Sequence, residues 1–411
     1  MKIGFYGATG SYDFGDYAMM VHNIQTILNR RPDTEIYIYT PDKYITLQML
    51  VDNMLDFQQL RQIKIVQEPT VLLGRYQRLV DKIEDKLVHK RHFFYSKYNN
   101  IKVGGEAFVN HDFMAAIKEC DFLLFNGGGF LQHSWDYRNM NFAMAVMIAG
   151  SYGKSVYFLS NSVGPMQKWD FCVRDLLPFV QKMMIRDGYR YTQKYLESLR
   201  FDRFMHGPDD LFFVNDEYTT EQKYENYVVI EVMTWLGRAS KGETYVLNQL
   251  VHLVDEVINE DRKNVVLVSF DRGDSDADRY MEYIQVHAMH PERISIESTA
   301  KCNMYEIFSL YRYCDFSVSL KYHPLILALG SNKPCIGIIC DDDGYYEGKL
   351  RGACDNLGID SHDVVMHIDE INSTSLLERY NSLKDGHIII NPNRREQLKA
   401  IRQKFLQELL E

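Results

Sequence analysis

The sequence alternates between short apolar runs and longer segments with a helical repeat of apolar positions. Short continuous apolar runs bounded by turn residues are typical of strands that are buried on both faces of a parallel sheet. In the first half of the chain these runs lie at residues 2–7, 35–40, 120–126, 155–160, 182–187 and 202–206. In the second half they lie at residues 227–235, 264–270, 293–298, 315–320 and 334–340.

The segments between these runs have the period of an amphipathic helix. Residues 17–30, 246–260 and 304–314 place their apolar side chains on one helical face. Strands that alternate with helices in this way predict parallel sheets with helices on both faces. The polar stretch 214–226 separates the two series and is our expected linker.

The chain is too long for one ordinary core. It has 411 residues, whereas single cores stop growing at roughly 250–300 residues. We therefore predict an α/β protein with two Rossmann-like domains facing a central cleft, at residues 1–215 and 216–392. Residues 393–411 are expected to form a final amphipathic helix. In folds of this kind the last helix often packs back on the first domain, and that placement is one expectation.

Composition argues against several classes of protein. A net charge of -10 disfavours a nucleic-acid partner, because such proteins carry a basic surface. The seven cysteines have no CxxC spacing, which predicts buried reduced thiols and neither a disulfide framework nor a zinc site. The first apolar run stops at Gly7, too early for a signal peptide. The longest apolar stretch, 142–150, is much shorter than the ~20 residues that span a bilayer. These features predict a cytoplasmic protein.

One segment of the predicted N-terminal domain departs from the pattern. Residues 75–100 read as a basic insertion, with an excess of lysine and arginine and with aromatic residues near its end. A solvated helix is one interpretation. The other is peripheral contact of residues 75–97 with an anionic membrane, at its inner face, or with a lipid-linked substrate.

Candidate ligand-binding residues follow several of the predicted strands, and ligands of doubly wound sheets bind beyond the carboxyl ends of strands. After the first strand, Gly7 and Gly10 let the backbone approach a ligand closely. Asp13 and Asp16 come next, before a helix expected to begin at Tyr17. One carboxylate is expected to cap that helix, and the other to bind a sugar hydroxyl or act as a base.

Two further clusters lie in the first half of the chain. Gly127, Gly128 and Gly129 follow a strand, which suits either close packing or backbone N–H contacts with an anion. Asn161 and Ser162 belong to a stiff turn that either faces the cleft or is a plain connection.

Cationic side chains end two other apolar runs. Arg186 has a planar fork that matches phosphate or carboxylate, and a structural pair with Asp187 is the alternative. Lys321 and His323 lie where a strand meets a helix, with Pro324 in the first helical turn. A helix N-terminus disfavours the charged form of His323, which suits proton transfer or phosphate contact.

The last cluster follows the final apolar run. Residues 341–343 are three aspartates, which read as a solvated loop or as ligands of Mg²⁺, and the sequence does not decide between them. We predict no metal. Lys349, at the start of the next helical pattern, is close enough in sequence to reach the cleft.

Taken in order, these clusters resemble the polysaccharide pyruvyltransferase family over roughly residues 3–360. "DFGD" at 13–16 resembles its Asn-x-Gly-Asp element, with Asp13 in place of asparagine. The other resembling elements are "NGGGFLQ" at 126–132, "NSVGP" at 161–165, "IRDGYRYTQKYL" at 185–196, "GPDDLFF" at 207–213 and "SLKYHPLILALGSNKPCIGI" at 319–338. The main departure is Lys321, where arginine is usual.

The resemblance implies a GT-B-like fold and an enzyme that moves the pyruvyl group of phosphoenolpyruvate onto a sugar. The acceptor would belong to a polysaccharide or its lipid-linked precursor, and the product would be a cyclic ketal. The implied donor-binding residues are Arg186, Lys321, His323, Lys349, Gly127, Gly128 and Gly129. The acceptor side takes Asp13, Asp16, Asn161 and Ser162. His323 is our candidate acid or phosphate contact, Asp16 our candidate base, and no cofactor is required.

Two other functions stay open at this stage. One is a nucleotide-sugar-dependent glycosyltransferase of the same architecture, and the other is a non-catalytic carbohydrate-binding relative. The sequence does not determine the acceptor sugar, the pair of hydroxyls, the ketal stereochemistry or the oligomeric state.

Overall fold

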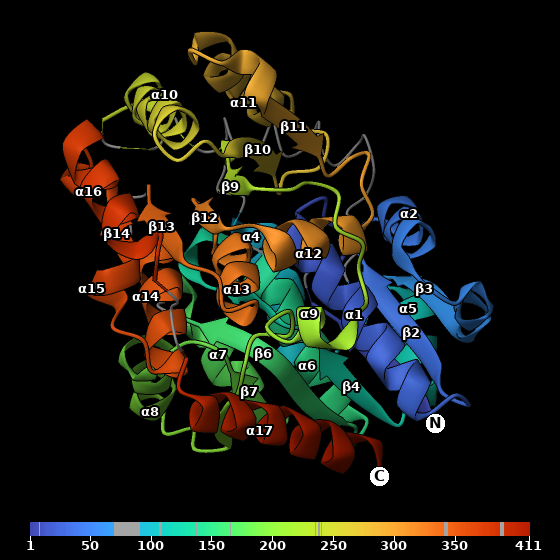
Figure 1. Cartoon of the computed structure of the whole chain (residues 1–411). Helices are drawn as coiled ribbons and strands as arrows, with labels where there is room; N and C mark the ends of the chain where they lie inside the picture. The colour runs from blue at the N-terminus through green and yellow to red at the C-terminus, as the bar shows by residue number, and fades with distance from the viewer. Residues whose placement is uncertain are drawn as a thin grey trace. The chain divides into compact units, whose positions relative to one another are not determined.

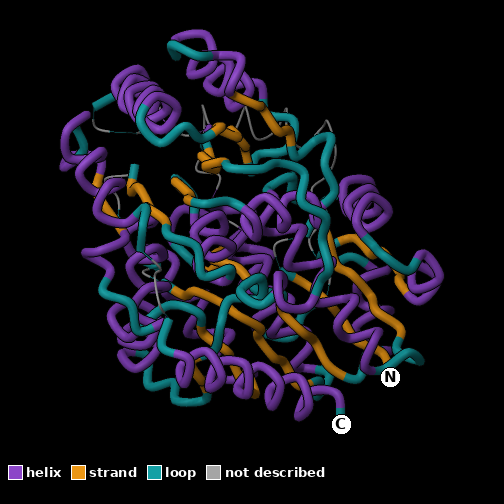
Figure 2. Tube along the Cα trace, viewed as in Figure 1, coloured by secondary structure: helices purple, strands orange, loops and turns teal. Residues whose placement is uncertain are grey.

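The computed structural model consists of parallel sheets flanked by helices (Figures 1 and 2). It describes residues 1–7, 9–69, 91–106, 109–135, 138–164, 166–234, 236, 239, 241–340, 344–386 and 390–411. Residues 75–90 of the basic insertion and the aspartates at 341–343 lie outside the described residues, so the membrane and metal interpretations placed on them stay predictions.

The described chain forms two compact units. Unit 1 comprises Met1–Ser11, Asn23–Ile185 and Thr192–Met205. Unit 2 comprises Tyr12–His22, Arg186–Tyr191 and His206–Glu411. The start of the first helix and the residues that follow strand β7 therefore belong to unit 2, far from most of it in sequence. The domain limits expected from the sequence stay a prediction.

The first sheet has eight strands in the order β3-β2-β1-β4-β6-β7-β8, with β5 paired to β6. Its strands are β1 (Lys2–Tyr6), β2 (Glu35–Thr40), β3 (Ile63–Gln67), β4 (Phe122–Phe125), β5 (Gly128–Leu131), β6 (Ser155–Val163), β7 (Val180–Ile185) and β8 (Phe204–His206). Its longer helices are α1 (Phe14–Arg30), α2 (Lys43–Asn53), α4 (Arg91–Lys102), α5 (His111–Glu119), α6 (Arg138–Ser151), α7 (Asp170–Leu176) and α8 (Lys194–Ser198). Single turns lie at η1 (Phe57–Gln62), η2 (His133–Trp135), η3 (Gln167–Trp169), η4 (Leu177–Phe179) and η5 (Tyr189–Gln193).

Aromatic side chains fill the centre of unit 1. Phe125 of β4 stacks on Phe158 of β6, with ring centroids 4.3 Å apart. Tyr6 of β1 and Phe142 of α6 pack against Phe125 at 5.5 and 5.9 Å. Because these strands are buried on both faces, they need apolar residues at consecutive positions, which is why they read as continuous runs in the sequence.

The second sheet has six strands in the order β11-β10-β9-β12-β13-β14. They are β9 (Tyr227–Glu231), β10 (Asn264–Ser269), β11 (Ile294–Ser298), β12 (Phe316–Ser319), β13 (Cys335–Ile339) and β14 (Val365–His367). The helices are α9 (Val214–Glu217), α10 (Glu243–Asn259), α11 (Ser275–His287), α12 (Met304–Tyr313), α13 (Tyr322–Gly330), α14 (Tyr345–Leu357), α15 (Ser361–Val364), α16 (Ser373–Leu383) and α17 (Pro392–Leu410), with single turns η7 (Pro291–Arg293) and η8 (Ile368–Glu370).

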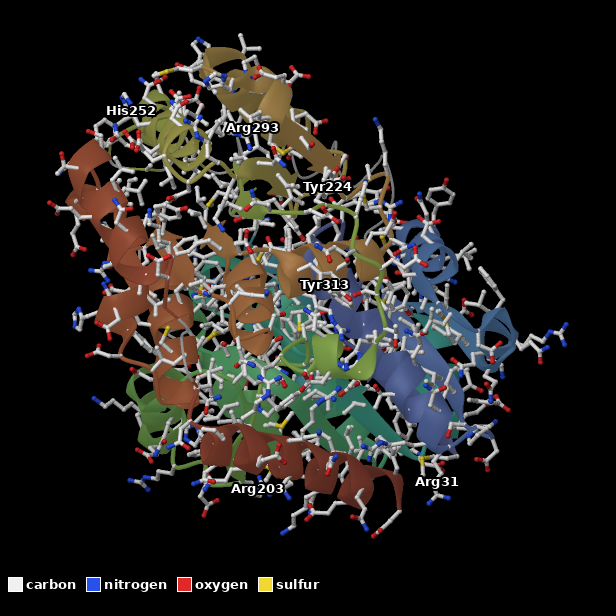
Figure 3. The ribbon with its side chains drawn as sticks, viewed as in Figure 1. Arg31, Arg203, Tyr224, His252, Arg293 and Tyr313 are labelled. Carbon is white, nitrogen blue, oxygen red and sulfur yellow. The ribbon has the colours of Figure 1, made fainter. Side chains whose placement is uncertain are left out.

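The predicted linker at 214–226 is a packed part of unit 2. Its first residues form α9, and the backbone after them is held by side chains of α12. Tyr313 donates a hydrogen bond to Thr220 O at 2.9 Å, and Arg312 donates to Tyr218 O at the same distance (Figure 3). The polar composition of the segment therefore does not mark a free connection.

The C-terminal helix α17 is anchored through a buried arginine. Arg402 donates to Glu217 of α9 at 2.8 Å and lies 2.5 Å from Nε2 of His22, in the part of α1 that belongs to unit 2. The His22 ring also lies 2.9 Å from the Tyr218 hydroxyl. These contacts join three segments that are far apart in the sequence.

Most of the predicted elements are present. Each predicted strand appears, and β3, β5 and β14 are additional. The helix expected to begin at Tyr17 begins at Phe14, so that expectation is wrong by one turn. All seven cysteines lie among the described residues, and each is a buried thiol outside any disulfide bond, as expected. Among the described residues, no helix is long and apolar enough to cross a membrane.

Candidate active site

An antiparallel bridge places the loop before α1 against the end of β10. The Phe14 N–H donates to Phe270 O at 2.8 Å, and the two rings pack with centroids 4.5 Å apart. Asp13 lies opposite Asp271 in this bridge. Two carboxylates separated by most of the chain are thereby brought together within unit 2.

Asp13 has two roles in this arrangement. Its Oδ1 accepts the Gly15 N–H at 3.0 Å and the Asp16 N–H at 3.4 Å, which caps α1. Its Oδ2 accepts a hydrogen bond from the Lys321 ammonium at 2.8 Å. The structure therefore identifies Asp13 as the capping carboxylate of the predicted pair, while Asp16 lies half-buried in the first turn of α1.

Lys321 is held by two carboxylates. Asp271 accepts from the ammonium at 2.5 Å, in addition to Asp13, and Thr234 donates to Asp271 through its N–H and its hydroxyl. Burial alone would lower the pKa of Lys321, but the two carboxylates raise that pKa well above its usual value. The side chain therefore stays charged. Asp271 was not among the predicted site residues, although it follows a predicted strand.

Glu231 lies behind this ion cluster at the end of β9. Its Oε2 accepts the N–H groups of Leu320 and Lys321 at 2.8 and 2.9 Å. Burial raises the pKa of this carboxyl to about 8, with the Lys321 charge opposing the rise. No exposed surface remains on Glu231. It, too, was missed from the sequence.

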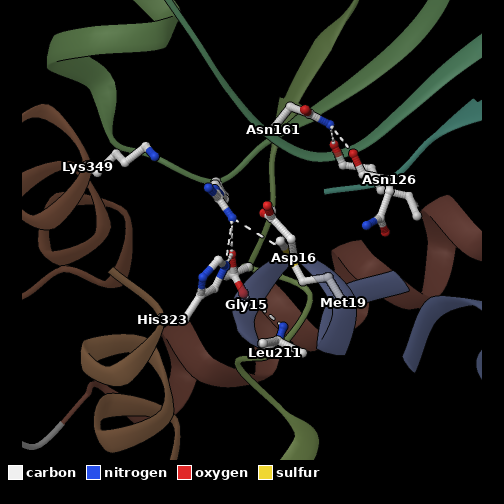
Figure 4. A network of polar contacts seen from close by, with 12 residues as sticks. Gly15, Asp16, Met19, Asn126, Asn161, Leu211, His323 and Lys349 are labelled. Carbon is white, nitrogen blue, oxygen red and sulfur yellow. Dashed lines mark hydrogen bonds and ion pairs between the residues drawn. The ribbon is translucent and has the colours of Figure 1, made fainter. Parts of the chain in front are cut away.

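Arg186, Asp209 and His323 form a second cluster (Figure 4). Arg186 Nη1 donates to Asp209 Oδ2 at 2.6 Å and lies 3.3 Å from His323 Nε2. The Tyr322 ring lies against the guanidinium, 4.3 Å from its carbon to the ring centroid. The structure thus brings Arg186 and His323 together. Arg186 forms an ion pair with Asp209, a partner that the sequence had not suggested.

Burial sets the charge of the His323 imidazole, and the contact with Arg186 sets its tautomer. Burial lowers the pKa of the imidazole to about 4, Asp209 opposes this shift, and the Arg186 charge adds to it. The ring is therefore neutral at pH 7. Because a guanidinium only donates hydrogen bonds, Nε2 must be the acceptor and Nδ1 must carry the proton. The expected suppression of the charged form is present, with burial as its main cause.

Gly15 leaves the space that the His323 ring occupies. A Cβ built at position 15 would lie 1.6 Å from His323 Nδ1, which no side-chain shift of a few tenths of an ångström relieves. Gly15 is part of the "DFGD" stretch, so this motif serves both the Asp13 cap and the approach of His323 to α1.

The exposed part of the site is acidic. The Asp13 and Asp271 side chains keep 31% and 19% of their surface exposed, and His323 keeps 11%. Arg186, in contrast, is only 1% exposed. A ligand would therefore meet the carboxylates and the imidazole first, with the guanidinium charge behind.

Lys349 lies on α14 beside an aromatic pair. Its ammonium is 3.7 Å from the centroid of the Tyr345 ring and donates to the Tyr345 hydroxyl. Its charge also contributes to the lowered pKa of His323, after burial and the nearer groups. Lys349 is thus electrostatically coupled to the imidazole.

The glycine cluster of unit 1 lies at the start of a strand. Gly128 and Gly129 begin β5, where Gly128 is paired with Asn161 of β6, and the expected anion contact of these glycines stays a prediction. A Cβ on Gly128 would lie 2.5 Å from the Phe130 ring. Close packing, the alternative that the sequence left open, explains the glycine. Gly127 directly precedes this strand.

Asn161 and Ser162 also lie in a strand, since β6 continues to Val163, and the predicted turn is wrong there. The Asn161 amide donates to Asn126 O at 3.1 Å and to Leu159 O at 2.6 Å. Both residues are buried in unit 1. The Asn161 side chain therefore holds backbone groups at the end of the sheet.

Comparison with known families identifies the chain. A family model described as polysaccharide pyruvyl transferase matches residues 13–342. The chain belongs to the polysaccharide pyruvyl transferase family. This confirms the resemblance seen in the sequence and implies a transferase that acts on a polysaccharide. The matched region of this family member contains Asp13, Arg186, Asp209, Lys321 and His323.

Solved structures support the fold of this pyruvyl transferase family member. A putative UDP-N-acetylglucosamine 2-epimerase from Listeria monocytogenes matches with a TM-score of 0.55 at 10% identity, covering 97% of this chain and 90% of that one. The UDP-GlcNAc 2-epimerase from Methanocaldococcus jannaschii gives 0.57 at 9% identity, with 96% and 94% coverage. The predicted α/β, GT-B-like fold with two parallel sheets is confirmed. Among curated proteins, none matches the sequence significantly.

Gly15→Ala should displace the His323 ring from Arg186. The added methyl group overlaps Nδ1, so we expect the pKa of His323 to rise from about 4 toward its usual 6.5. Overpacking should cost about 1–3 kcal/mol of unfolding free energy. Imidazole NMR signals, assigned with a His323→Gln variant, follow the titration. Gly337→Ala, whose Cβ would first meet the end of the Leu325 side chain at 3.3 Å, is the control. An unchanged His323 titration in Gly15→Ala would contradict the steric argument.

Stability should fall in acid partly through His323. The folded pKa of about 4 lies below the ordinary 6.5, so the unfolded state binds this proton more readily. Stability from this group is complete above pH 6.5 and is lost as pH falls toward 4, by about 3 kcal/mol in total. Urea unfolding of the wild type and His323→Gln between these pH values tests this. We expect a shallower decline in the variant, and equal slopes would rule out the assigned titration.

Proposed function

We propose that this chain transfers the pyruvyl group of phosphoenolpyruvate to two hydroxyls of one sugar, forming a cyclic ketal and releasing phosphate. The observation that carries the proposal is a neutral histidine held by a buried arginine beside two partly exposed carboxylates, in a member of the pyruvyl transferase family. The acceptor is a sugar of a polysaccharide or of its lipid-linked precursor.

The donor binds where positive charge is fixed. Phosphoenolpyruvate carries a carboxylate and a phosphate. Arg186 and Lys349 place cationic charge near His323, and Lys321 lies two residues before it in the sequence. Because Arg186 is buried, it acts chiefly by orienting His323 and by its charge. The expected backbone contacts from Gly127–Gly129 receive no support from β5, and they are not part of this proposal.

Donor binding changes the protonation of His323. A dianion placed beside a neutral imidazole stabilises its charged form, so the pKa of His323 rises on binding. His323 then either donates a proton to the donor or forms a charge-assisted hydrogen bond to the phosphate. Arg186 keeps Nε2 oriented in the free enzyme, and Gly15 leaves room for the other edge of the ring.

The reaction balances with two protons that leave the sugar and two that are taken up. One proton is added to the methylene carbon of the donor, which leaves a cationic C2. The first sugar hydroxyl attacks C2 and loses its proton, and the second hydroxyl then displaces the phosphate and loses its own. The proton taken up by carbon and the one that protonates the departing phosphate balance the two that the hydroxyls release.

The acceptor hydroxyls bind at the acidic edge of the site. Asp13 and Asp271 have exposed surface and accept hydrogen bonds, and Asp16 lies in the adjoining turn of α1. One of these carboxylates serves as the base, and Asp16 keeps its place as our first candidate. The scheme needs no cofactor because phosphoenolpyruvate itself carries the leaving group.

His323→Ala should abolish phosphate release from phosphoenolpyruvate while leaving the fold intact. Loss of an acid or base typically costs about 10²–10⁴-fold in rate. Purified protein is incubated with phosphoenolpyruvate and a panel of soluble and lipid-linked glycans, and phosphate and glycan mass are measured. His252→Ala, an exposed histidine on α10, is the matched control and should be fully active (Figure 3).

Three outcomes would contradict the proposal. Wild-type turnover by a folded His323→Ala variant would remove His323 from the site. Release of nucleotide from a nucleotide sugar, with no phosphate from phosphoenolpyruvate, would instead identify a glycosyltransferase. Donor binding without turnover on any glycan of the panel would favour a carbohydrate-binding relative.

A further inference from the structure

We propose that Glu231 is a positioning residue that fixes the turn between β12 and α13 and thereby places Lys321 and His323 for pyruvyl transfer. The kinetic part of this inference rests on the proposed function, whereas the structural part does not. Neither the family match nor the sequence pattern assigns a role to Glu231.

The position of Glu231 follows from the sheet. β9 lies between β10 and β12, and Ile230 is paired with Val318. Glu231 is therefore the last residue of β9 at the level where β12 ends. Beyond Ser319 the ladder stops, and the next two N–H groups, of Leu320 and Lys321, need another acceptor. The Oε2 atom of Glu231 accepts both, at 2.8 and 2.9 Å.

The start of α13 depends on this contact. Lys321 is the N-cap residue of α13, and its own side chain does not cap the helix. A carboxyl group from the neighbouring strand thus holds the backbone of the N-cap residue and of the residue before it. The backbone of Lys321 is extended, with φ -111° and ψ 170°.

The position of this turn determines where three consecutive site residues lie. Lys321 reaches Asp13 and Asp271. Tyr322 lies against the guanidinium of Arg186, and His323 contacts the same guanidinium. A shift of the turn would disturb all of these contacts together.

The protonation state of the buried Glu231 side chain indicates which substitution would preserve its hydrogen bonds. Glu231 has no exposed surface, and its Oε1 has no hydrogen-bond partner among the described residues. A full charge there would add to the excess of carboxylates around Lys321. Burial raises its pKa to about 8, so the neutral acid predominates at pH 7. Glutamine therefore resembles the resident form in shape, charge and carbonyl acceptor.

Two substitutions at Glu231 distinguish the position of its hydrogen-bond acceptor from the presence of an acidic group. Glu231→Gln keeps a carbonyl oxygen at the same reach, and we expect kcat within about threefold of the wild type. Glu231→Asp keeps an acid but shortens the side chain by one methylene, so both N–H groups lose their acceptor. Losing buried hydrogen bonds of this kind should lower kcat by about 10- to 100-fold.

Hydrogen exchange provides a measurement that does not depend on turnover. The Leu320 and Lys321 amides should be protected in the wild type and in Glu231→Gln, and should exchange faster in Glu231→Asp. In Glu231→Asp, the NMR titration of His323 should also move toward its usual pKa, which a loss of global stability alone would not cause.

The control is a second buried glutamate of the same sheet. Glu297 on β11 is 6% exposed and accepts hydrogen bonds from Lys223 and Tyr224. Glu297→Gln should lower stability and leave kcat and the His323 titration unchanged.

These experiments test the role of Glu231 separately from the proposed function. If Glu231→Gln is as impaired as Glu231→Asp, or if Glu231→Asp keeps wild-type kcat and amide protection, the positioning role is wrong. If the wild type releases no phosphate from phosphoenolpyruvate, the proposed function fails. Hydrogen exchange and the His323 titration then decide the role of Glu231 alone.

Discussion

The Lys321 ammonium between Asp13 and Asp271 is the interaction on which the candidate active site depends. It joins residues 308 and 50 positions apart in the sequence. Removing one partner of a buried ion cluster leaves uncompensated charge, which is far more costly than the cluster is stabilising. The start of α1, the end of β10 and the start of α13 are therefore constrained together.

Lysine is chemically suited to this particular position. In the family, arginine is usual at this position, and its planar fork best fits a single carboxylate or phosphate. An ammonium has three donors that point in different directions, so it can serve Asp13 and Asp271 on separate segments. The departure from the usual residue is thus matched by its surroundings, and it does not by itself indicate a lost site.

The second cluster is organised around a neutral acceptor. Asp209 forms an ion pair with Arg186. The same guanidinium also donates to Nε2 of His323 and thereby holds the imidazole in one tautomer. This arrangement keeps the imidazole uncharged until an anion arrives. Preorganised charge of this kind needs little rearrangement during a reaction, which is the main source of electrostatic catalysis.

The strands were predictable because burial on both faces makes them continuous apolar runs. Arg186, Lys321 and His323 could also be predicted as candidate site residues, because polar residues at the ends of apolar runs stand out in a sequence. Asp209 and Asp271 were missed because their importance depends on partners remote in sequence. Asp271 does follow a strand, and Glu231 is a lone acid within an apolar run, so both left a signal. Asn161 was misassigned because buried amides that serve backbone groups resemble turn residues.

The absent side chain at Gly15 couples two distant positions. Because the imidazole of His323 fills the volume beside this residue, the sizes permitted at 15 and 323 are linked. Any substitution at one of these positions must therefore be designed together with the other. A smaller residue at 323 would free position 15 for alanine, and the beginning of α1 would then gain helix propensity at the expense of the imidazole.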